Sequence, residues 1–245
     1  MRLFIDAFGD TAATIIELLC NEFDLNIQDI FVKTYELREN VNLIHYLEEN
    51  SFEYTTKCYS SLDIEVEFTT LLSIFGREKI PRALLKKAIF SMNVHPSLLP
   101  KYGGCFSVPW CIINNEKVTG VTFHEISENF DEGAIIHQLE VDIDITATAH
   151  SLYSKIYSTI IQNYCSVLKK YLNNDIELIA QDLEQATYFP RQLPYEGRIN
   201  PLWDKPLVER FIRAMIYPPY LPAVFYSNGT KKYITNIKEY SDAKG

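Results

Sequence analysis

The chain has 245 residues, of which 47% are hydrophobic, and its formal net charge at pH 7 is −9. This length and apolar content suit one domain, or one domain with an appendage, that buries a proper core. The acidic balance disfavours a nucleic-acid partner, which would need a basic patch, and no apolar run is long enough to span a membrane.

The N-terminal part of the sequence alternates short apolar runs with segments of helical periodicity. These patterns predict strands over 3–8, 27–34 and 52–57, and helices that start at about 10 and about 40. Asp10 or Thr11 is expected to cap the first helix. The β-α-β-α-β order predicts an α/β fold with a Rossmann-like, doubly wound and mostly parallel sheet. The turn after the first strand has one glycine, Gly9, and lacks the G-x-G-x-x-G pattern, so no dinucleotide site is predicted.

The middle of the chain continues this pattern and ends in a long helix. The predicted elements are a strand over 68–75, a helix over 82–88, a strand over 90–95, a helix over 108–114, and strands over 120–126 and 134–143. Thr148 is expected to cap a helix whose apolar residues recur every three or four positions, before Asn173 and Asn174 stop it.

The composition changes after residue 185, where proline becomes frequent and only one helix, over 206–216, is predicted. We therefore divide the chain into a main domain over 1–185 and a small C-terminal subdomain over 186–245. The subdomain is too thin to bury its own aromatic residues, which favours a homodimer. The five cysteines are odd in number and form no C-x-x-C pair, so we expect free thiols in a reducing cytoplasm.

The stretch SMNVHPSLLPKYGG, residues 91–104, carries the most informative polar residues of the chain. Asn93 and His95 lie two positions apart, so in an extended strand they point to the same side. Pro96 cannot continue a central strand because it lacks an N–H, and the pair Gly103-Gly104 favours a loop. Ligands of open α/β sheets bind beyond the carboxyl ends of strands, so an amide and an imidazole at this place indicate a site.

This stretch resembles the signature of the folate-dependent formyltransferases, in which an Asn-x-His pair precedes Pro-Ser-Leu-Leu-Pro and an Asp-x-Gly turn follows downstream. Here Asp131-Glu132-Gly133 matches the second element, after the segment Gly120–His124. The resemblance is specific because two motifs occur in the right order, and it covers about 71–144 well and extends more weakly to about 225. The tail after residue 185 is similar to that of the sugar N-formyltransferases within this family.

The resemblance implies that Asn93, His95 and Asp131 form the catalytic set. They would transfer a formyl group from N10-formyltetrahydrofolate to an amine, without a metal or a covalent enzyme intermediate. The amide N–H can donate to the developing oxyanion, and the imidazole can donate to the same oxygen or move a proton. Asp131 either holds His95 in one tautomer or accepts the proton of the amine. A metal site that adds His124 and His137 is disfavoured, because these positions lack short ligand spacing.

The resemblance also maps two segments onto a folate pocket, residues 77–81 and 127–130, whose backbone groups match the edges of a pterin ring. The cofactor-binding residues expected there are Arg77, Lys79, Ile80, Ser127, Glu128 and Phe130. Arg77 or Lys79 would meet the glutamate of the folate or the phosphates of the other substrate. An exposed loop at the entry of a helix is the alternative for each of these two side chains.

The amine substrate is expected to carry a diphosphate and a base. The substrate-binding residues expected are Lys101, Gly103, Gly104, Arg191 and Tyr220, and further aromatic residues available to stack on a base are Tyr188, Phe189 and Trp203. A glycine at position 103 replaces the Arg or Lys often seen in relatives, which leaves more room for the acceptor and removes one positive charge.

The sequence therefore predicts a sugar N-formyltransferase that acts on a dTDP-linked amino-dideoxy sugar, for example dTDP-4-amino-4,6-dideoxyglucose. Its product would enter O-antigen, part of the bacterial lipopolysaccharide, or a similar surface glycan. One alternative is formylation of methionyl-tRNA or glycinamide ribonucleotide, which the acidic balance and the proline-rich tail disfavour. The other alternative is a folate-binding protein without catalytic activity.

Overall fold

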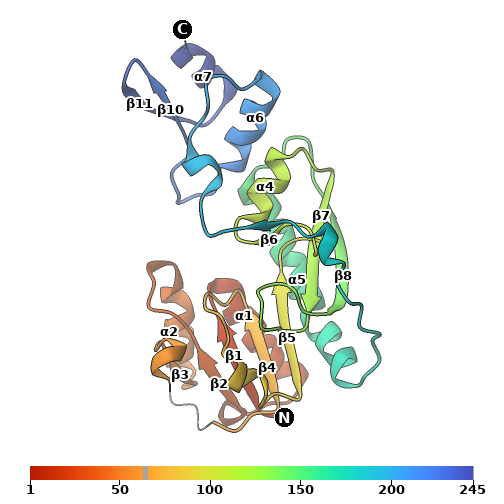
Figure 1. Ribbon diagram of the computed structural model, residues 1–245. Helices are drawn as coiled ribbons and strands as arrows, with labels where there is room; N and C mark the ends of the chain where they lie inside the picture. The colour runs from red at the N-terminus through yellow and green to blue at the C-terminus, as the bar shows by residue number, and fades with distance from the viewer. Residues whose placement is uncertain (63–65, 245) are drawn as a thin grey trace. The chain divides into compact units, whose positions relative to one another are not determined.

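The computed structural model describes residues 1–62 and 66–244 and combines a seven-stranded sheet with helices (Figure 1). Its strands are β1 (Leu3–Ala7), β2 (Ile30–Lys33), β3 (Glu53–Thr55), β4 (Thr70–Ile74), β5 (Phe90–His95), β6 (Gly103–Gly104), β7 (Val118–His124), β8 (Ile135–Asp142), β9 (Tyr188–Phe189), β10 (Ala223–Ser227) and β11 (Thr230–Ile234). Its helices are α1 (Asp10–Glu22), α2 (Val41–Glu49), α3 (Arg82–Leu85), α4 (Ser107–Ile113), α5 (Ala149–Leu172), α6 (Lys205–Ala214) and α7 (Ile237–Lys244).

The large sheet has the strand order β3-β2-β1-β4-β5-β7-β8. The first five of these strands pair in parallel, whereas β7 runs antiparallel to β5. Parallel strands need crossover connections, and α1 and α2 supply them between β1, β2 and β3. The predicted α/β class and mostly parallel, doubly wound sheet are therefore confirmed. The adjacent β7 and β8 also confirm the predicted pairing of the two strands that flank the Asp131 loop.

Two compact units make up the chain, and each contains segments that are distant in sequence. The first unit consists of residues 1–95, 122–138 and 159–183, and the second of residues 96–121, 139–158 and 184–245. The main domain over 1–185 and the subdomain over 186–245 remain our proposal for the domain division.

The core of the first unit forms because its central strands are apolar on both faces. All five residues of β1 are buried, and α1 packs its apolar stripe inward through Ala12, Ile15, Ile16 and Leu19. The helix α1 begins at Asp10 as predicted, but the structure corrects its predicted capping residue, Asp10 or Thr11. Gly9 takes the N-cap position with a φ of 82°, a conformation that glycine adopts without steric cost, and its N–H donates to Asn40 Oδ1 at 2.8 Å.

The C-terminal part of the chain holds more regular structure than predicted. The expected helix is present as α6, where Asp204 Oδ1 accepts the N–H of Leu207 at 2.9 Å. The antiparallel hairpin β10–β11 and the helix α7 were not predicted. Their sequences carry weak patterns, since β11 buries only Ile234 and α7 buries only Tyr240 and Ala243. Among the described residues no helix is both long and apolar enough to cross a membrane.

Candidate active site

Strands β5 and β7 bring three polar side chains to one edge of the sheet. Their antiparallel register places Asn93 opposite His124 and His95 opposite Thr122. Residues directly opposite on paired strands share a face, and positions i and i+2 of one strand share a face as well. Asn93, His95 and His124 are therefore grouped by backbone pairing, and His95 and His124 are buried.

A short chain of hydrogen bonds fixes the orientation of the Asn93 carboxamide. His124 Nδ1 lies 2.7 Å from the carbonyl oxygen of Glu125, which can only accept, so the proton of this imidazole is on Nδ1. His124 Nε2 then acts as the acceptor for Asn93 Nδ2 at 3.0 Å. The bond leaves the second hydrogen of the Asn93 nitrogen available to another acceptor.

The charge state of His124 supports this assignment. Burial lowers the pKa of His124 to about 4, against an upward pull from Asp131 and a further downward push from His95. The ring is therefore neutral at physiological pH, and its Nε2 lone pair is present to accept the Asn93 N–H.

Asp131 approaches both histidines from the loop between β7 and β8. Its Oδ1 lies 3.5 Å from His95 Nδ1 and 3.7 Å from His124 Nε2, and its side chain is only 11% exposed. Because His124 keeps its proton on Nδ1 and accepts the Asn93 N–H at Nε2, it has no N–H to donate to the carboxylate. The favourable partner of Asp131 is therefore His95, where the carboxylate favours a proton on Nδ1.

The structure explains why the Asp-x-Gly turn has an aspartate at position 131 and a glycine at position 133. Asp131 has a φ of 59°, in the left-handed region that Asp tolerates better than most residues. A Cβ at Gly133 would lie 1.8 Å from the carbonyl oxygen of Glu125, so only glycine fits. Gln181 Nε2 reaches the carbonyl oxygens of both Asp131 and Gly133 at 2.7 Å. These contacts hold the loop that carries the carboxylate.

Chemically, the cluster combines a fixed amide donor with an imidazole and a nearby carboxylate. Such a set can donate to an oxygen that gains negative charge and can move a proton near neutral pH. The sequence indicated Asn93, His95 and Asp131 but not the part that His124 takes. The sequence signal for His124 is its position at the end of an apolar strand. Only the register between β7 and β5 shows that His124 lies opposite Asn93.

The residues expected around the folate lie in two places within the first unit. In the loop after β4, the Arg77 guanidinium lies over the ring of Phe8 at 4.5 Å, and Lys79 is exposed. Ile80 is buried with Leu71 and Leu84 in the core, so its side chain is committed to packing.

The second expected folate segment is the loop that precedes Asp131. Ser127 Oγ donates to the carbonyl oxygen of Asn129 at 2.8 Å, which shapes the loop. Glu128 forms an ion pair with Arg82 at 2.7 Å, and the side chain of Phe130 is 46% exposed. Among these residues, Phe130 offers the largest exposed apolar surface to a ligand.

The residues expected to bind the amine substrate belong to the second unit. Gly103 and Gly104 form β6, which pairs in parallel with Tyr188 and Phe189 of β9. A Cβ at Gly104 would lie 2.1 Å from the carbonyl oxygen of Phe189, so close backbone packing requires a glycine here. Lys101, Arg191 and Tyr220 are exposed.

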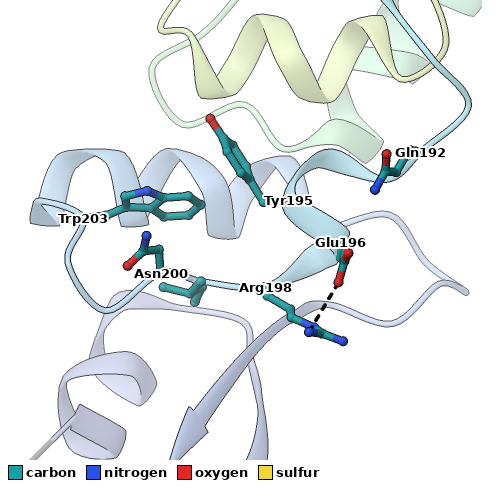
Figure 2. A pocket seen from close by; sticks show the side chains of 7 residues that line it. Gln192, Tyr195, Glu196, Arg198, Asn200 and Trp203 are labelled. Atoms are coloured by element: carbon teal, nitrogen blue, oxygen red, sulfur yellow. Dashed lines mark ion pairs between the residues drawn. The ribbon is translucent and has the colours of Figure 1, made fainter.

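The second unit also contains a pocket of about 380 Å³ (Figure 2). Its lining residues are Gln192, Tyr195, Glu196, Arg198, Ile199, Asn200 and Trp203. The rings of Tyr195 and Trp203 meet edge to face at 4.8 Å, and Arg198 pairs with Glu196 at 3.3 Å. Of the aromatic residues considered for base stacking, Trp203 lines this pocket, whereas Phe189 is stacked on Trp110 at 4.6 Å.

Over residues 1–62 and 66–244, no group of three or more His, Cys, Asp or Glu side chains is arranged to hold a metal ion. His137, which the disfavoured metal alternative required, is exposed on β8.

Comparison with known proteins agrees with this geometry. Residues 63–168 match the formyl transferase family. The chain is 34% identical to a GDP-perosamine N-formyltransferase of Brucella melitensis biotype 1, in an alignment that covers 98% of this chain and 94% of the relative.

Two solved structures have the same fold over most of their length. The crystal structure of WlaRD, a sugar 3N-formyl transferase in the presence of dTDP and 5-N-formyl-THF, aligns with a TM-score of 0.80 at 23% identity. The alignment covers 94% of this chain and 84% of the WlaRD chain. The N-formyltransferase of Helicobacter canadensis, in complex with folinic acid and dTDP-3-aminofucose, has a TM-score of 0.77 at 25% identity and covers 94% and 86%. With its Asn-x-His and Asp-x-Gly motifs at one sheet edge, the chain belongs to the formyltransferase family, among the sugar N-formyltransferases.

Proposed function

We propose that the protein transfers a formyl group from N10-formyltetrahydrofolate to the amino group of a nucleotide-linked amino sugar. The observation that carries this proposal is the cluster at the edge of β5 and β7, where an oriented Asn93 amide lies beside His95 and Asp131. Acyl transfer to an amine needs an oxyanion donor and a proton carrier, and this cluster contains both.

The proposed role of Asn93 follows from its hydrogen bond to His124. The neutral His124 accepts one Nδ2 hydrogen of Asn93 and thereby directs the other hydrogen toward the formyl oxygen of a bound substrate. That oxygen gains negative charge when the amine nitrogen attacks the formyl carbon, so a donor fixed in advance stabilises the transition state. The donor carries no net charge, so its action does not depend on pH near neutrality.

His95 and Asp131 are proposed to manage the proton. As the new C–N bond forms, the amine nitrogen must lose a proton, and the folate nitrogen N10 must gain one when its bond to the formyl carbon breaks. With Asp131 on its Nδ1 side at 3.5 Å, His95 would act toward the substrates through Nε2. Asp131 either stabilises this tautomer of His95 or accepts the proton of the amine, and both roles fit its position.

The folate co-substrate supplies the formyl group, and two loops of the first unit are proposed to hold it. These are the loop from Arg77 to Ile80 and the loop from Ser127 to Phe130. The first loop follows the carboxyl end of β4, where ligands of such sheets bind, and the second loop directly precedes Asp131. Backbone groups of these loops would meet the pterin, with Phe130 available for apolar contact.

Two nucleotide sugars are candidates for the acceptor. The sequence predicts a dTDP-linked amino-dideoxy sugar such as dTDP-4-amino-4,6-dideoxyglucose. The similarity to a GDP-perosamine N-formyltransferase over nearly the whole chain favours a GDP-linked acceptor as the second candidate. Lys101, Arg191 and Tyr220 stay our proposed contacts for the nucleotide, with Trp203 as a further candidate for stacking on its base.

The proposal is tested by a panel of acceptors with N10-formyltetrahydrofolate as donor. The panel contains GDP-perosamine, dTDP-4-amino-4,6-dideoxyglucose, glycinamide ribonucleotide and methionyl-tRNA, and the release of tetrahydrofolate is followed together with the mass of each product. We expect a mass gain of one formyl group on an amino sugar nucleotide. Formylation of methionyl-tRNA or glycinamide ribonucleotide alone would refute the proposal. Folate binding without turnover on any acceptor would instead favour the non-catalytic alternative.

We further propose a cytoplasmic homodimer whose product enters O-antigen or another surface glycan of the lipopolysaccharide type. The support for the compartment is the set of free cysteines, and the support for the glycan is the sugar N-formyltransferase family.

A further inference from the structure

A buried carboxylate lies in the first unit at the end of β1 and belongs to none of the groups described above. Asp6 is fully buried, and each of its two oxygens accepts a hydrogen bond from a tyrosine. Tyr35 Oη donates to Oδ1 at 2.7 Å, and Tyr59 Oη donates to Oδ2 at 3.0 Å. A carboxylate buried inside a fold costs free energy unless it is hydrogen-bonded, and these two phenols supply that compensation.

The Tyr35 hydroxyl has a second set of partners. It accepts the backbone N–H of Arg77 at 2.7 Å and that of Glu78 at 3.2 Å, in the loop that follows β4. A phenol oxygen has one hydrogen to donate and two lone pairs with which to accept, so all its hydrogen-bonding capacity is used. Tyr35 therefore connects the buried carboxylate directly to the backbone of this loop.

The loop is also packed against the carboxylate itself. A Cβ at Gly76 would lie 2.6 Å from Asp6 Oδ2, so the backbone passes directly over Asp6. Phe75, just before it, has a φ of 59°, a conformation that a bulky residue keeps only where its surroundings enforce it. The loop backbone thus takes a shape that local sequence preference would not select.

A buried cation and an acid complete the cluster. Lys33 Nζ, at the end of β2, is fully buried, lies 3.3 Å from the centre of the Tyr35 ring and is 3.5 Å from Glu78 Oε2. Glu78 Oε2 also accepts the backbone N–H of Tyr59 at 3.1 Å. The Lys33 ammonium therefore holds Tyr35 from one side and the loop residue Glu78 from the other.

We propose that Tyr35 is a positioning residue that holds the loop Gly76–Glu78 in the shape that binds the folate co-substrate. The inference rests on the proposed function, in which backbone groups of this loop meet the pterin. Recognition through backbone groups requires a fixed backbone, because no side chain can adjust to compensate for a displaced N–H or C=O. Asp6 and Lys33 act through Tyr35 and the loop and do not themselves touch the ligand.

The test compares Tyr35→Phe with Tyr59→Phe in the full-length protein. Each change removes one phenol donor to the same carboxylate, and the two side chains are similarly buried, with 7% and 9% exposure. Only Tyr35 contacts the loop N–H groups through its hydroxyl. We measure the dissociation constant of 5-formyltetrahydrofolate by calorimetry, and KM and kcat for N10-formyltetrahydrofolate with the acceptor that the panel identifies.

In Tyr35→Phe we expect the dissociation constant and KM for the folate to rise about tenfold, with kcat within about twofold of wild type. In Tyr59→Phe we expect both folate constants to stay within about twofold of wild type. Equal effects of the two variants, or a fall in kcat without a change in folate affinity, would overturn the positioning role.

A second readout does not depend on activity. Amide hydrogen exchange at Arg77 and Glu78 is expected to be faster in Tyr35→Phe than in Tyr59→Phe, and unchanged exchange would overturn the proposal. Gly76→Ala provides another variant if Tyr35→Phe does not fold, because it displaces the loop while both tyrosines remain, and it should weaken folate binding as well. If the wild-type protein and both tyrosine variants bind folate equally well, this inference alone is refuted. If the wild-type protein binds no folate, the proposed function is refuted.

Discussion

At the scale of single residues, hydrogen-bond geometry assigns protonation states that decide what each group can do. The carbonyl of Glu125 forces the proton of His124 onto Nδ1, and this in turn orients Asn93. Asp131 then has one useful histidine partner, His95. Each assignment follows from which atoms can donate and which can only accept.

The first prediction concerns the two residues proposed to act on the formyl group. Asn93→Ala and His95→Ala are each expected to lower kcat at least about a hundredfold, because an oxyanion donor or a proton carrier is lost. Steady-state kinetics would measure the effect, and circular dichroism would check that the fold is intact. Wild-type turnover by either variant would remove that residue from the mechanism.

The second prediction separates the orienting role of His124 from simple packing. His124→Phe keeps a ring but removes the acceptor for Asn93, and we expect kcat to fall at least about tenfold. His124→Gln places an amide oxygen near the position of Nε2 and should recover part of the lost kcat. Equal kcat values in the two variants would show that the hydrogen bond to Asn93 does not matter for turnover.

The third prediction uses Asp6 and His124, two buried groups whose pKa shifts change the free energy of unfolding in opposite directions as the pH falls. Burial raises the pKa of Asp6 to about 6 from an ordinary value of 3.8, so the folded chain binds this proton more readily than the unfolded chain. The Asp6 contribution is present below pH 3.8 and is lost as the pH rises through 6. The pKa of His124 is lowered from 6.5 to about 4, so its contribution is present above pH 6.5 and is lost as the pH falls toward 4.

Asp6→Asn removes the first contribution and leaves the second. The free energy of unfolding of this variant should therefore fall more steeply than that of wild type between pH 6.5 and 4, by on the order of 2 to 3 kcal/mol. Urea denaturation at several pH values measures the difference. His124→Gln is the opposite control, because it keeps only the Asp6 contribution, and its free energy of unfolding should rise relative to wild type as the pH falls from 6.5 to 4. Parallel curves for all three proteins would contradict the prediction.

At the scale of elements, the proposed active site depends on a turn that is held by its neighbours. The loop between β7 and β8 carries Asp131 in a left-handed conformation, and Gln181 donates to two of its carbonyl oxygens. Tyr171 of α5 also donates to Glu125 Oε1 at 2.7 Å, next to His124. The turn is thus fixed by contacts with the C-terminal part of α5 and the segment that follows it.

The fourth prediction tests the glycine of this turn. Gly133→Ala places a methyl group against the Glu125 carbonyl, so we expect the free energy of unfolding to fall by more than about 2 kcal/mol and kcat to fall with it. Gly229→Ala is the control, because a Cβ there meets nothing within 4 Å and its φ of +77° costs about 1 kcal/mol. A Gly133→Ala protein as stable as the control would show that the turn can relax.

At the scale of the whole molecule, charge and exposed apolar surface are the informative properties. The net charge of −9 suits a small acceptor held by a few specific cations and disfavours a tRNA backbone. The C-terminal residues 186–245 leave large apolar side chains exposed, for example Leu202 at 89% and Leu221 at 66%. A contiguous patch of such groups is typical of surfaces that bind another protein, whereas single exposed apolar groups are common on any protein surface.

The fifth prediction follows from that exposure. We expect sedimentation velocity to give a molecular mass of about two chains, since pairing of subdomains would cover part of this apolar surface. A single-chain mass at micromolar concentration would contradict the proposed homodimer.

Much of the first unit could be predicted because its signals are local. Apolar runs and helical periodicity predicted the strands β1 to β5 and the helices between them, and β5 has its predicted bounds of Phe90–His95. The strand β11 and the helix α7 were missed because few of their residues are buried, and β10 was missed because its three buried residues are consecutive and do not alternate with exposed ones.

By itself the sequence determined the α/β class, the family motifs, and the residues Asn93, His95 and Asp131 as the groups to examine. Only the tertiary structure showed that His124 pairs with Asn93 and that Asp6, Tyr35 and Tyr59 meet beneath the loop after β4. The reason is physical: periodicity reports which face of an element is buried, whereas the partner of a polar group depends on which distant strands pair and in what register.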